Sequence, residues 1–501
     1  MDYIAVIDIG MTNKKVAVYD GNLVQLDARY RNFPPKMVDG IETHDLEAME
    51  DWFVEQLAGF AKKYAIKAIA VSTHGATFVC VGEGRFLGKP SVPCVYYTYE
   101  PGDDFHRQFY ERLGSPAALQ ARTGTPYLKS MINTAKGIFF AQQKYPEEFK
   151  NTVHLLMYPQ YWGYRFTGKT GAEGTYMGCH AYLWDQIDNR LSSVADELGV
   201  SPLMPPKLNR SWDVLGTITE AFAQKTGLAE DVIVTMGIHD SNSSLLPHFA
   251  KKGETGFLLN STGTWCVSMN PVQKYGFAPD ELGKVVFFNI SAFGKPVKTG
   301  IFLGGQEFET WSKVLMDIHK RADLPGYDEE LYRRVLREKQ AFLTPELSAG
   351  SGQFPLSKPR VVEDGRDYHY GLLSKGKEIP PCFKNYETGF ALLRISLVMQ
   401  SLTAFERIGL APGEEVFTEG GFRKNEAYNV LLSSALKDNP TFLTDIAEAS
   451  AFGAAMTAKM ALTGQGLSTL AKDFEIEYQE VAKADIPELF PYRAAWLELA
   501  K

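Results

Sequence analysis

The pattern of hydrophobic and polar positions begins with three short apolar runs, at residues 3 to 9, 15 to 20 and 23 to 30. Each is β-branched or alternating, and turn-forming residues at 10 to 14 and 20 to 22 separate them. Short strand-like runs joined by such turns predict an antiparallel meander of three strands. The chain is therefore expected to open with a sheet.

A helix and a further strand are predicted directly after this meander. Between residues 45 and 64, apolar residues recur at intervals of three and four, which indicates an amphipathic helix. These residues are Leu46, Met49, Phe53, Leu57, Phe60 and Tyr64. Residues 65 to 72 then form a buried strand that ends at Thr73, His74 and Gly75. Strand, helix and strand after a meander favour an α/β fold with a mixed sheet, in which ligands collect at the carboxyl ends of strands.

The middle of the first half shows a weaker pattern. Residues 104 to 150 and 189 to 200 favour helix, with a turn at 124 to 126. The segment from 158 to 185 is rich in glycine and aromatic residues, and we expect it to be loop.

A second meander is predicted from about residue 256. Strand-like runs at 256 to 261, 265 to 269 and 285 to 290 follow one another, with a Gly/Thr turn at 262 to 264. This order repeats that of the first meander and indicates two related halves, with domains at 1–245 and 246–501. The alternative is a pair of unrelated hairpins in one β-rich protein.

The remainder of the second half alternates surface and core elements. Residues 312 to 385 are rich in charge and then in loop-forming residues, as expected for surface helices and an excursion. Residues 389 to 409 are apolar on most faces, which predicts a buried helix. A strand running into a Gly-Gly turn follows, with helices at about 425 to 437 and 447 to 461.

Composition excludes several classes of protein. A chain of 501 residues exceeds the size at which single cores stop growing, so at least two domains are expected. Its formal net charge of -8 comes without a basic block, which argues against nucleic acid or an anionic membrane as partner. We find no secretory signal, and no apolar run is expected to reach the length of a membrane span.

The five cysteines are an odd set without a C-x-x-C pair. This argues against a disulfide framework or a zinc site and favours a reducing compartment, the cytoplasm. The cysteines are Cys80, Cys94, Cys179, Cys266 and Cys382.

Asp240 is the candidate catalytic residue. It lies in the stretch GIHDSNSSL, between the two predicted Gly/Thr-rich hairpins in sequence. A carboxylate there is placed to take a proton from an incoming hydroxyl while the hairpins hold a polyphosphate, as a phosphoryl transfer requires.

Two turns are candidate phosphate sites. The first places Asp8 at a strand end, Gly10 in the turn, and Thr12, Asn13 and Lys15 on the return. Amides of such a turn suit phosphate oxygens, and the aspartate suits a magnesium ion. The second turn, at 262 to 264, offers hydroxyls and amides only. Simple turn chemistry is the alternative for each one alone.

Two Gly-Gly pairs allow close approach of a ligand. Gly420 and Gly421 lie between a strand and a helix, and Gly304 and Gly305 precede another predicted helix. A structural turn without ligand explains either pair equally well. The G-x-x-x-x-G-K-[ST] loop is not found in the sequence.

Five motifs together carry a family resemblance. In chain order they are IDIGMTNKKVAVYD, GIHDSNSSLL, NSTGTW, EGGFRKNEAYNVLLSSAL and EASAFGAAMTA. Their order and intervals resemble those of the FGGY carbohydrate kinases over nearly the whole chain. The resemblance implies two ribonuclease-H-like domains of the actin and hexokinase type, closing over ATP, magnesium and a sugar or polyol.

The resemblance also implies roles for individual residues. Asp240 matches the family's catalytic base, and Asp8, together with Asp240, the magnesium site. The implied ATP contacts are Gly10, Thr12, Asn13, Lys15, Thr262, Gly263, Thr264, Gly421 and Asn425. Gly304 and Gly305 are a further candidate contact for phosphate or ribose, from the residues alone. The implied sugar contacts are His74, Gly75, Ala76, Tyr97, Glu100, His239 and Asp240.

The sugar fingerprints point in different directions. His74, Gly75 and Ala76 resemble a sugar-contacting turn of xylulokinase-like members, whereas His239 and the Gly-Thr-Trp at 263 to 265 are closer to rhamnulokinases and fuculokinases. Many members carry Trp, an acidic residue and Arg where this chain has Tyr96 to Glu100. Tyr97 or Glu100 is the candidate substitute for that arginine, with core packing of the aromatic residues as the alternative.

We therefore expect a cytoplasmic ATP-dependent kinase of a small ketose such as L-rhamnulose or L-fuculose. Xylulose, ribulose and polyols are the alternatives, and an actin-like ATPase switch or scaffold is the rival from another class. Its expected partners are the sugar and ATP, without nucleic acid or membrane. A homodimer is left open.

Overall fold

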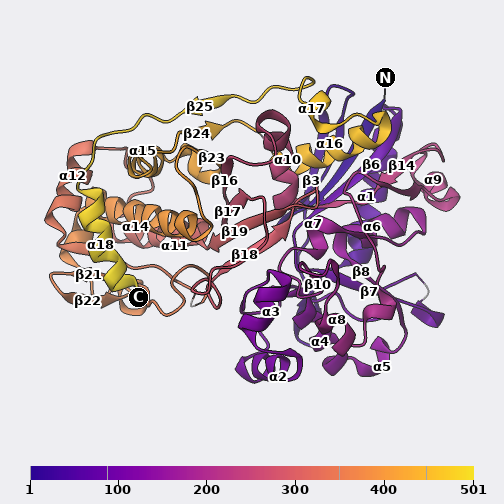
Figure 1. Cartoon of the computed structure of the whole chain (residues 1–501), viewed down its shortest axis with the longest axis horizontal. Coiled ribbons are helices and arrows are strands. Elements are labelled where there is room, and N and C mark those ends of the chain that lie inside the picture. The colour runs from indigo at the N-terminus through magenta and orange to yellow at the C-terminus, as the bar shows by residue number, and fades with distance from the viewer. Residues whose placement is uncertain (1, 87, 349, 447) are drawn as a thin grey trace.

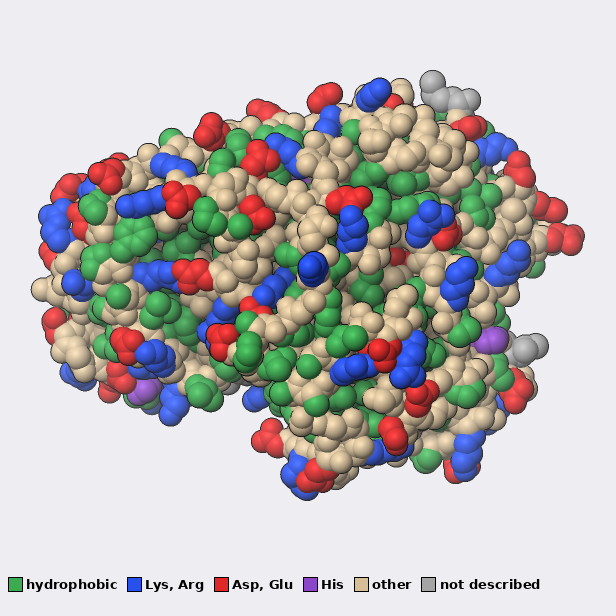
Figure 2. Space-filling model, in the orientation of Figure 1, with side chains coloured by type: hydrophobic (Ala, Val, Ile, Leu, Met, Phe, Trp, Pro, Cys, Tyr) green, Lys and Arg blue, Asp and Glu red, His purple; other side chains and the backbone are tan. Residues whose placement is uncertain are grey.

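The structure is a computed structural model that describes residues 2–86, 88–348, 350–446 and 448–501. Two lobes, each built on a mixed β-sheet, make up the α/β fold (Figure 1). Lys/Arg and Asp/Glu side chains are interspersed over the face shown in Figure 2, without a broad area of one sign.

The first lobe contains the elements up to α10. Its strands are β1 (Tyr3–Ile9), β2 (Asn13–Tyr19), β3 (Gln25–Asn32), β4 (Lys36–Val38), β5 (Ile41–Thr43), β6 (Ile66–Thr73), β7 (Phe78–Gly82), β8 (Thr152–Met157), β9 (Ala172–Glu173), β10 (Trp184–Asp185), β11 (Arg190–Leu191), β12 (Leu208–Asn209), β13 (Val214–Thr217), β14 (Ile233–Thr235) and β15 (Ile238–His239). Its helices are α1 (Leu46–Ala61), α2 (Asp103–Leu113), α3 (Pro116–Thr123), α4 (Thr134–Lys144), α5 (Pro146–Phe149), α6 (Tyr158–Thr167), α7 (Gly174–Met177), α8 (Ser193–Glu197), α9 (Glu220–Thr226) and α10 (Asp240–Lys252), with short 3-10 turns η1 (Gly84–Phe86) and η2 (Ser201–Leu203).

The second lobe follows α10. Its strands are β16 (Phe257–Thr262), β17 (Cys266–Pro271), β18 (Val286–Ile290), β19 (Pro296–Phe302), β20 (Ala341–Leu343), β21 (Arg360–Glu363), β22 (Arg366–His369), β23 (Glu415–Gly420), β24 (Thr441–Thr444) and β25 (Tyr478–Glu480). Its helices are α11 (Gly304–His319), α12 (Glu329–Glu338), α13 (Tyr370–Leu373), α14 (Tyr386–Arg407), α15 (Glu426–Ala435), α16 (Ala449–Thr463), α17 (Leu467–Leu470) and α18 (Leu489–Ala500), with 3-10 turns η3 (Pro381–Lys384) and η4 (Gly421–Lys424).

The two main sheets share one topology. In the first, β1, β2 and β3 are antiparallel, and β6 and β14 extend the sheet parallel to β1. In the second, β16, β17 and β19 are antiparallel, and β23 and β24 extend it parallel to β16. The predicted first meander and the predicted repeat of its order are thus present. The predicted boundary at 245/246 falls inside α10.

Two details of the sequence prediction were wrong. The third strand of the second meander is β19, and the run at 285 to 290 is instead β18, which pairs outside β19. The segment from 158 was expected to be loop but contains α6. Its aromatic residues Tyr158, Tyr161, Trp162 and Phe166 are buried at helical spacing, and Gly168 ends the helix in the left-handed conformation.

The predicted buried helix is α14, in the core of the second lobe. By length and composition it is apolar enough to cross a membrane, so the prediction of no such run was wrong. Buried residues make up 94% of its apolar window, however, and it packs on α11, α12 and α15. Its apolar surface is thus covered by its own lobe.

A pair of helices joins the two lobes. α10 and α16 pack against each other, and α16 also covers β1 and β6 of the first sheet. One apolar cluster includes Val6 and Ala17 of the first sheet, Leu259 of the second, and Leu245 and Ala454 of the two helices. The Oγ of Ser243 donates to the carbonyl of Ser450 at 2.7 Å.

Gly453 makes this helix crossing possible, and its substitution is expected to destabilise the protein. A Cβ at residue 453 would lie 2.0 Å from the carbonyl oxygen of Ser243. This oxygen belongs to the backbone of α10 and cannot move away as a flexible side chain would. Gly453→Ala should therefore lower the free energy of unfolding by about 1–3 kcal/mol, as overpacking does. Gly371→Ala is the matched control, since a Cβ there meets nothing within 4 Å. Equal thermal unfolding midpoints for the two variants would contradict this account.

Candidate functional site

Asp240 is the first residue of α10, so it lies at a helix N-terminus. Its Oδ1 accepts a hydrogen bond from the backbone N–H of Ser241 at 2.6 Å. The side chain is 31% exposed. Withdrawal from bulk water raises the pKa of Asp240 to about 6, and the hydrogen bonds from Ser241 oppose this rise. A carboxylate of this pKa is a suitable proton acceptor near neutral pH.

Asp8 lies next to the carboxyl end of β1, on the face that meets α16. Its Oδ2 accepts a hydrogen bond from the Oγ of Ser450 at 2.8 Å. Its Oδ1 is buried and accepts no hydrogen bond of good geometry from the described residues. Burial raises the pKa of Asp8 to about 6, and the negative charge of Asp240 adds to the rise. The two carboxylates are therefore close enough to interact.

Asp240 lines a cavity of about 190 Å³, which we call the small cavity. Its walls come from both lobes, which places the cavity at their junction. The lining residues are His74, Gly75, Ala76, Tyr97, Ile132, Cys179, His180, His239, Asp240, Ser241, Trp265, Val267, Phe287, Asn289 and Ile301. Most of the sugar contacts implied by the resemblance are thus brought together here.

Three imidazoles surround Gly75 in the small cavity. A Cβ on Gly75 would lie 2.7 Å from Nε2 of His239 and 2.8 Å from Nε2 of His180. Burial lowers the pKa of His74, His180 and His239, each to about 3. Near neutral pH the rings are therefore uncharged, and each can donate or accept a hydrogen bond.

Glu100, a predicted sugar contact, is not among the described residues that line the small cavity. Its carboxylate accepts hydrogen bonds from the backbone N–H groups of Gly102 and Ser130, and pairs with His106 Nε2 at 2.7 Å. These contacts hold it in a structural role at the start of α2. Of the two candidate substitutes for the family arginine, only Tyr97 faces the small cavity.

A second cavity of about 570 Å³, which we call the large cavity, lies in the second lobe. It is lined by Thr262, Gly263, Thr264, Gly305, Phe308, Glu309, Leu324, Pro325, Gly326, Tyr327, Arg394, Gly421, Phe422, Lys424, Asn425, Glu426 and Ala427. The turn at 262 to 264 belongs to the large cavity, whereas Trp265 and Val267 belong to the small one. The β16–β17 hairpin therefore stands between the two cavities.

Backbone approaches backbone around this hairpin. A Cβ on Gly305 would lie 2.0 Å from the carbonyl oxygen of Gly263, and one on Gly420 would lie 2.1 Å from that of Thr262. Gly304, also predicted to contact ATP, is not among the described residues of the large cavity. A Cβ there would instead meet the Sγ of Cys266 at 2.5 Å, so its smallness serves packing.

The first predicted phosphate turn adjoins the small cavity, because the backbone N–H of His74 donates to the carbonyl oxygen of Ile9 at 2.9 Å. Gly10, Thr12 and Asn13 are at the β1–β2 turn and are not among the described lining residues of either cavity. Lys15, with a side chain 5% exposed, forms an ion pair with Glu448 at the start of α16. The pair therefore links the two lobes beside Asp8, the partner of Lys15 in the β1–β2 register.

Several lining residues were not predicted from the sequence. In the large cavity, Arg394 is the lone charged residue of an otherwise apolar stretch of α14, a signal that could have marked it. It donates to the Tyr332 hydroxyl at 3.2 Å and to the Pro325 carbonyl at 2.8 Å. In the small cavity, Cys179 and His180 lie in a segment expected to be loop, and no local pattern distinguishes them.

Family models match both lobes. The model of the FGGY family of carbohydrate kinases, N-terminal domain, matches residues 3–247, and that of the carbohydrate kinase FGGY, C-terminal domain, matches residues 254–466. The chain belongs to the FGGY family.

Solved structures are similar over nearly the whole chain. A carbohydrate kinase from Novosphingobium aromaticivorans has a TM-score of 0.78 and 26% identity, covering 99% of this chain and 97% of that one. A xylulose kinase from Lactobacillus acidophilus has a TM-score of 0.78 at 15% identity, covering 100% and 96%, which shows the fold alone. The predicted fold class is confirmed.

The curated relatives are rhamnulokinases that match part of the chain. One from Yersinia pestis bv. Antiqua (strain Angola) is 26% identical over 232 residues, which cover 46% of this chain and 45% of that protein. One from Halalkalibacterium halodurans is 24% identical over 278 residues, covering 53% and 55%. The chain thus spans about half the length of the curated relatives it matches.

The partly buried carboxylate of Asp8 should make stability depend on pH. Its folded pKa lies above the ordinary value, so the folded state holds a proton that the unfolded state releases. Stability from this group is therefore present below pH 4 and is lost as pH rises towards 6. Asp8→Asn removes this titration. Relative to wild type, the free energy of unfolding of the variant should therefore be about 1–2 kcal/mol higher at pH 8 than at pH 4. Denaturant unfolding at both pH values measures this difference, and Asp2→Asn, at an exposed position, is the control.

Proposed function

We propose that the protein transfers the γ-phosphate of ATP to a hydroxyl of a small ketose of the L-rhamnulose or L-fuculose type. One observation carries this proposal: Asp240 lines the small cavity, and the hairpin at 262 to 264 separates that cavity from the large one. Acceptor and nucleotide would thus lie on opposite sides of one hairpin. The first lobe, up to about residue 245, would supply most acceptor contacts and the rest of the chain the nucleotide site.

Asp240 is the proposed general base. Its pKa of about 6 leaves it largely ionised at pH 7 yet basic enough to accept the proton of an acceptor hydroxyl as that oxygen attacks the γ-phosphorus. The leaving group is ADP. The position of Asp240 at the N-terminus of α10 also favours its ionised form, because the positive end of the helix dipole lies there.

The nucleotide contacts follow from the large cavity. Amides and hydroxyls at Thr262, Gly263 and Thr264 would bind phosphate oxygens, since the turn offers no carboxylate to repel them. Gly421 and Asn425 would lie against the adenosine, with Gly305 closing the wall next to Gly263. Gly10, Thr12, Asn13 and Lys15 would complete the phosphate site from the first lobe.

A magnesium ion fits the two carboxylates. The buried Oδ1 of Asp8 lacks a good donor among the described residues, and the charge of Asp240 raises the pKa of Asp8. A hard cation with oxygen ligands satisfies both features, so Asp8 and Asp240 would hold it. When bound, Mg²⁺ neutralises negative charge on the phosphate oxygens.

Support for the class of acceptor comes from the small cavity and the relatives. A volume of about 190 Å³ suits a small sugar, and three neutral imidazoles with Tyr97 offer hydrogen bonds to its hydroxyls. Rhamnulokinases are among the curated relatives. Xylulose, ribulose or a polyol is the next choice. Because all five cysteines are free and buried, we propose a reducing, cytoplasmic setting.

A screen of ketoses and polyols by coupled ADP production tests the proposal. One ketose should raise ADP release far above the background with water, and Asp240→Asn should lower kcat by about 100- to 10,000-fold, the range of a general base. The wild-type rate should rise as pH increases through about 6, because the base must lose its proton, and the variant should lack this rise. ADP release that ignores every acceptor would indicate an ATPase switch and refute the proposal.

Gly75→Ala tests the acceptor site separately. The added methyl group would press on His239 and His180, so KM for the acceptor should rise at least about tenfold, equal to 1.4 kcal/mol. KM for ATP should stay within about twofold, since residue 75 is not among the described residues of the large cavity. Gly59→Ala, where a Cβ meets nothing within 4 Å, is the control. An equal rise in both KM values would place the acceptor elsewhere.

A further inference from the structure

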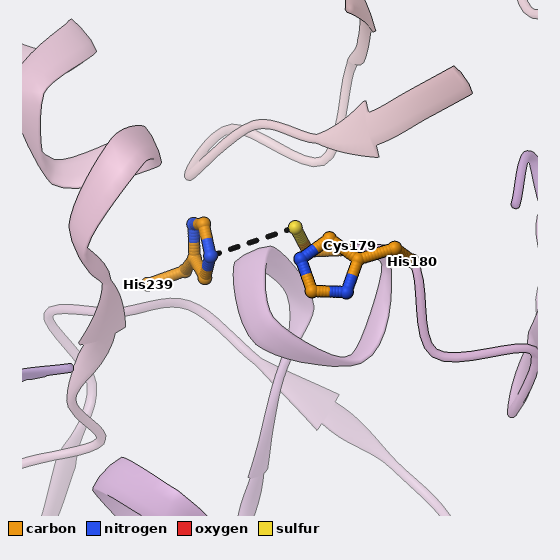
Figure 3. Close-up of side chains that lie close together, drawn as sticks. All are labelled: Cys179, His180 and His239. Carbon is orange, nitrogen blue, oxygen red and sulfur yellow. Dashed lines mark hydrogen bonds between the residues drawn. The ribbon is translucent and has the colours of Figure 1, made fainter. Parts of the chain in front are cut away.

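Cys179, His180 and His239 form a cluster in the wall of the small cavity that the proposed transfer does not require as a set (Figure 3). Each offers one ligand atom, and these atoms lie within 4.8 Å of one another. The Sγ of Cys179 is 3.5 Å from Nε2 of His239. The residues come from two segments, the chain after α7 and the end of β15, so the fold alone brings them together.

These separations suit a tetrahedral metal site. Zinc binds thiolate sulfur at about 2.3 Å and imidazole nitrogen at about 2.0–2.1 Å, which puts neighbouring ligand atoms about 3.3–3.7 Å apart. Cys179 Sγ and His239 Nε2 already have this spacing at 3.5 Å. The other ligand-atom separations lie within 4.8 Å, so side-chain movements of about 1 Å would close the cluster on an ion. A three-ligand set also leaves one coordination position for water or another oxygen.

His180 is already oriented as metal-binding histidines are. Its Nδ1 donates to the carbonyl oxygen of Ile132 at 2.8 Å, which leaves the lone pair on Nε2. Its backbone has φ of 39°, in the left-handed region that non-glycine residues rarely adopt. His180 therefore holds its ring in the cavity wall at a conformational cost, next to Cys179.

Gly75 leaves the space in which the two imidazoles meet. Its missing Cβ would otherwise lie within 2.8 Å of Nε2 of both His180 and His239. Asp240, whose Oδ1 is 3.6 Å from His239 Nε2, adds negative charge beside the cluster.

We propose that Cys179, His180 and His239 bind one thiophilic divalent cation of the zinc class. Sulfur and imidazole ligands select such an ion over Mg²⁺, which prefers carboxylate oxygens and water. Binding displaces the thiol proton of Cys179 to solvent, and both imidazoles bind as neutral donors. The site is distinct in ligand chemistry from the carboxylates of Asp8 and Asp240.

Titration of the reduced, chelator-treated chain of 501 residues with Co²⁺, without nucleotide or sugar, tests this site. We expect one Co²⁺ per chain, a sulfur-to-cobalt charge-transfer band in the near ultraviolet, and displacement of Co²⁺ by Zn²⁺. Cys179→Ser should abolish the band, and His180→Gln should weaken Co²⁺ binding at least tenfold. Cys94→Ser removes another buried thiol and should retain the band.

Two outcomes overturn the site. One is the absence of a charge-transfer band in folded wild-type protein, and the other is its persistence in Cys179→Ser. Thermal unfolding of each variant shows whether a lost band reflects a lost ligand or a lost fold. His239→Gln removes another proposed ligand and provides an independent test of the same site. Weak binding without a sulfur band would mean that the cluster serves only as a hydrogen-bonding wall.

The ion and the acceptor should exclude each other, a consequence that rests on the proposed function. Both occupy the small cavity of about 190 Å³, so Zn²⁺ should raise KM for the acceptor while leaving KM for ATP unchanged, and a chelator should reverse the effect. A cobalt band combined with no competition against the acceptor would retain the metal site and contradict the placement of the acceptor. The two proposals can thus fail separately.

Discussion

The packing of α10 against α16 is the constraint on which the rest of the structure depends. These helices lie between the two sheets, and their apolar residues belong to a cluster that includes both sheets. Close contact between Ser243 and Gly453, near the start of each helix, fixes where the two N-termini lie. Asp240 begins one helix, and Ser450 in the first turn of the other donates to Asp8. The site is therefore positioned by the interface between the lobes and not by either lobe alone.

This arrangement has an electrostatic cost that the helices reduce. Asp8 and Asp240 each have a pKa raised to about 6, mainly by burial, so the ionised forms are disfavoured relative to water. Helix N-termini carry partial positive charge, which stabilises anions placed there. The Lys15 and Glu448 pair adds one cation next to Asp8 and ties it to the second lobe. Two neighbouring carboxylates lower the stability of the protein when no cation is bound. The same two charges favour the binding of a cation between them.

Elements with a strong local pattern were predictable from the sequence, and those set by tertiary pairing were not. The strands at 3 to 9 and 66 to 73 and the helix at 386 to 407 are buried over nearly their whole length, so their continuous apolar runs suffice. The sequence could not show that β19, and not β18, is the third strand of the second meander. Either run suits an edge strand or a central strand, and only the pairing of the strands distinguishes them. The helix at 158 to 167 was missed because its glycine and aromatic content was given more weight than the helical spacing of its apolar residues. The structure shows that these residues are buried.

The same distinction applies to the candidate site. Residues within short motifs, such as Asp240 and Thr262, line the cavities because a turn or helix start places them there. Glu100 shows the limit of this inference, because its carboxylate accepts from backbone N–H groups and pairs with a histidine, and it is not among the described residues that line the small cavity. His180 and His239 show the opposite case, since no spacing rule links residues so far apart in the chain. Their proximity requires the turn at Gly75, where only the absence of a side chain lets two imidazoles share one wall. Such a site therefore depends on a glycine that leaves room for the two rings, and not on a sequence motif of ligand residues.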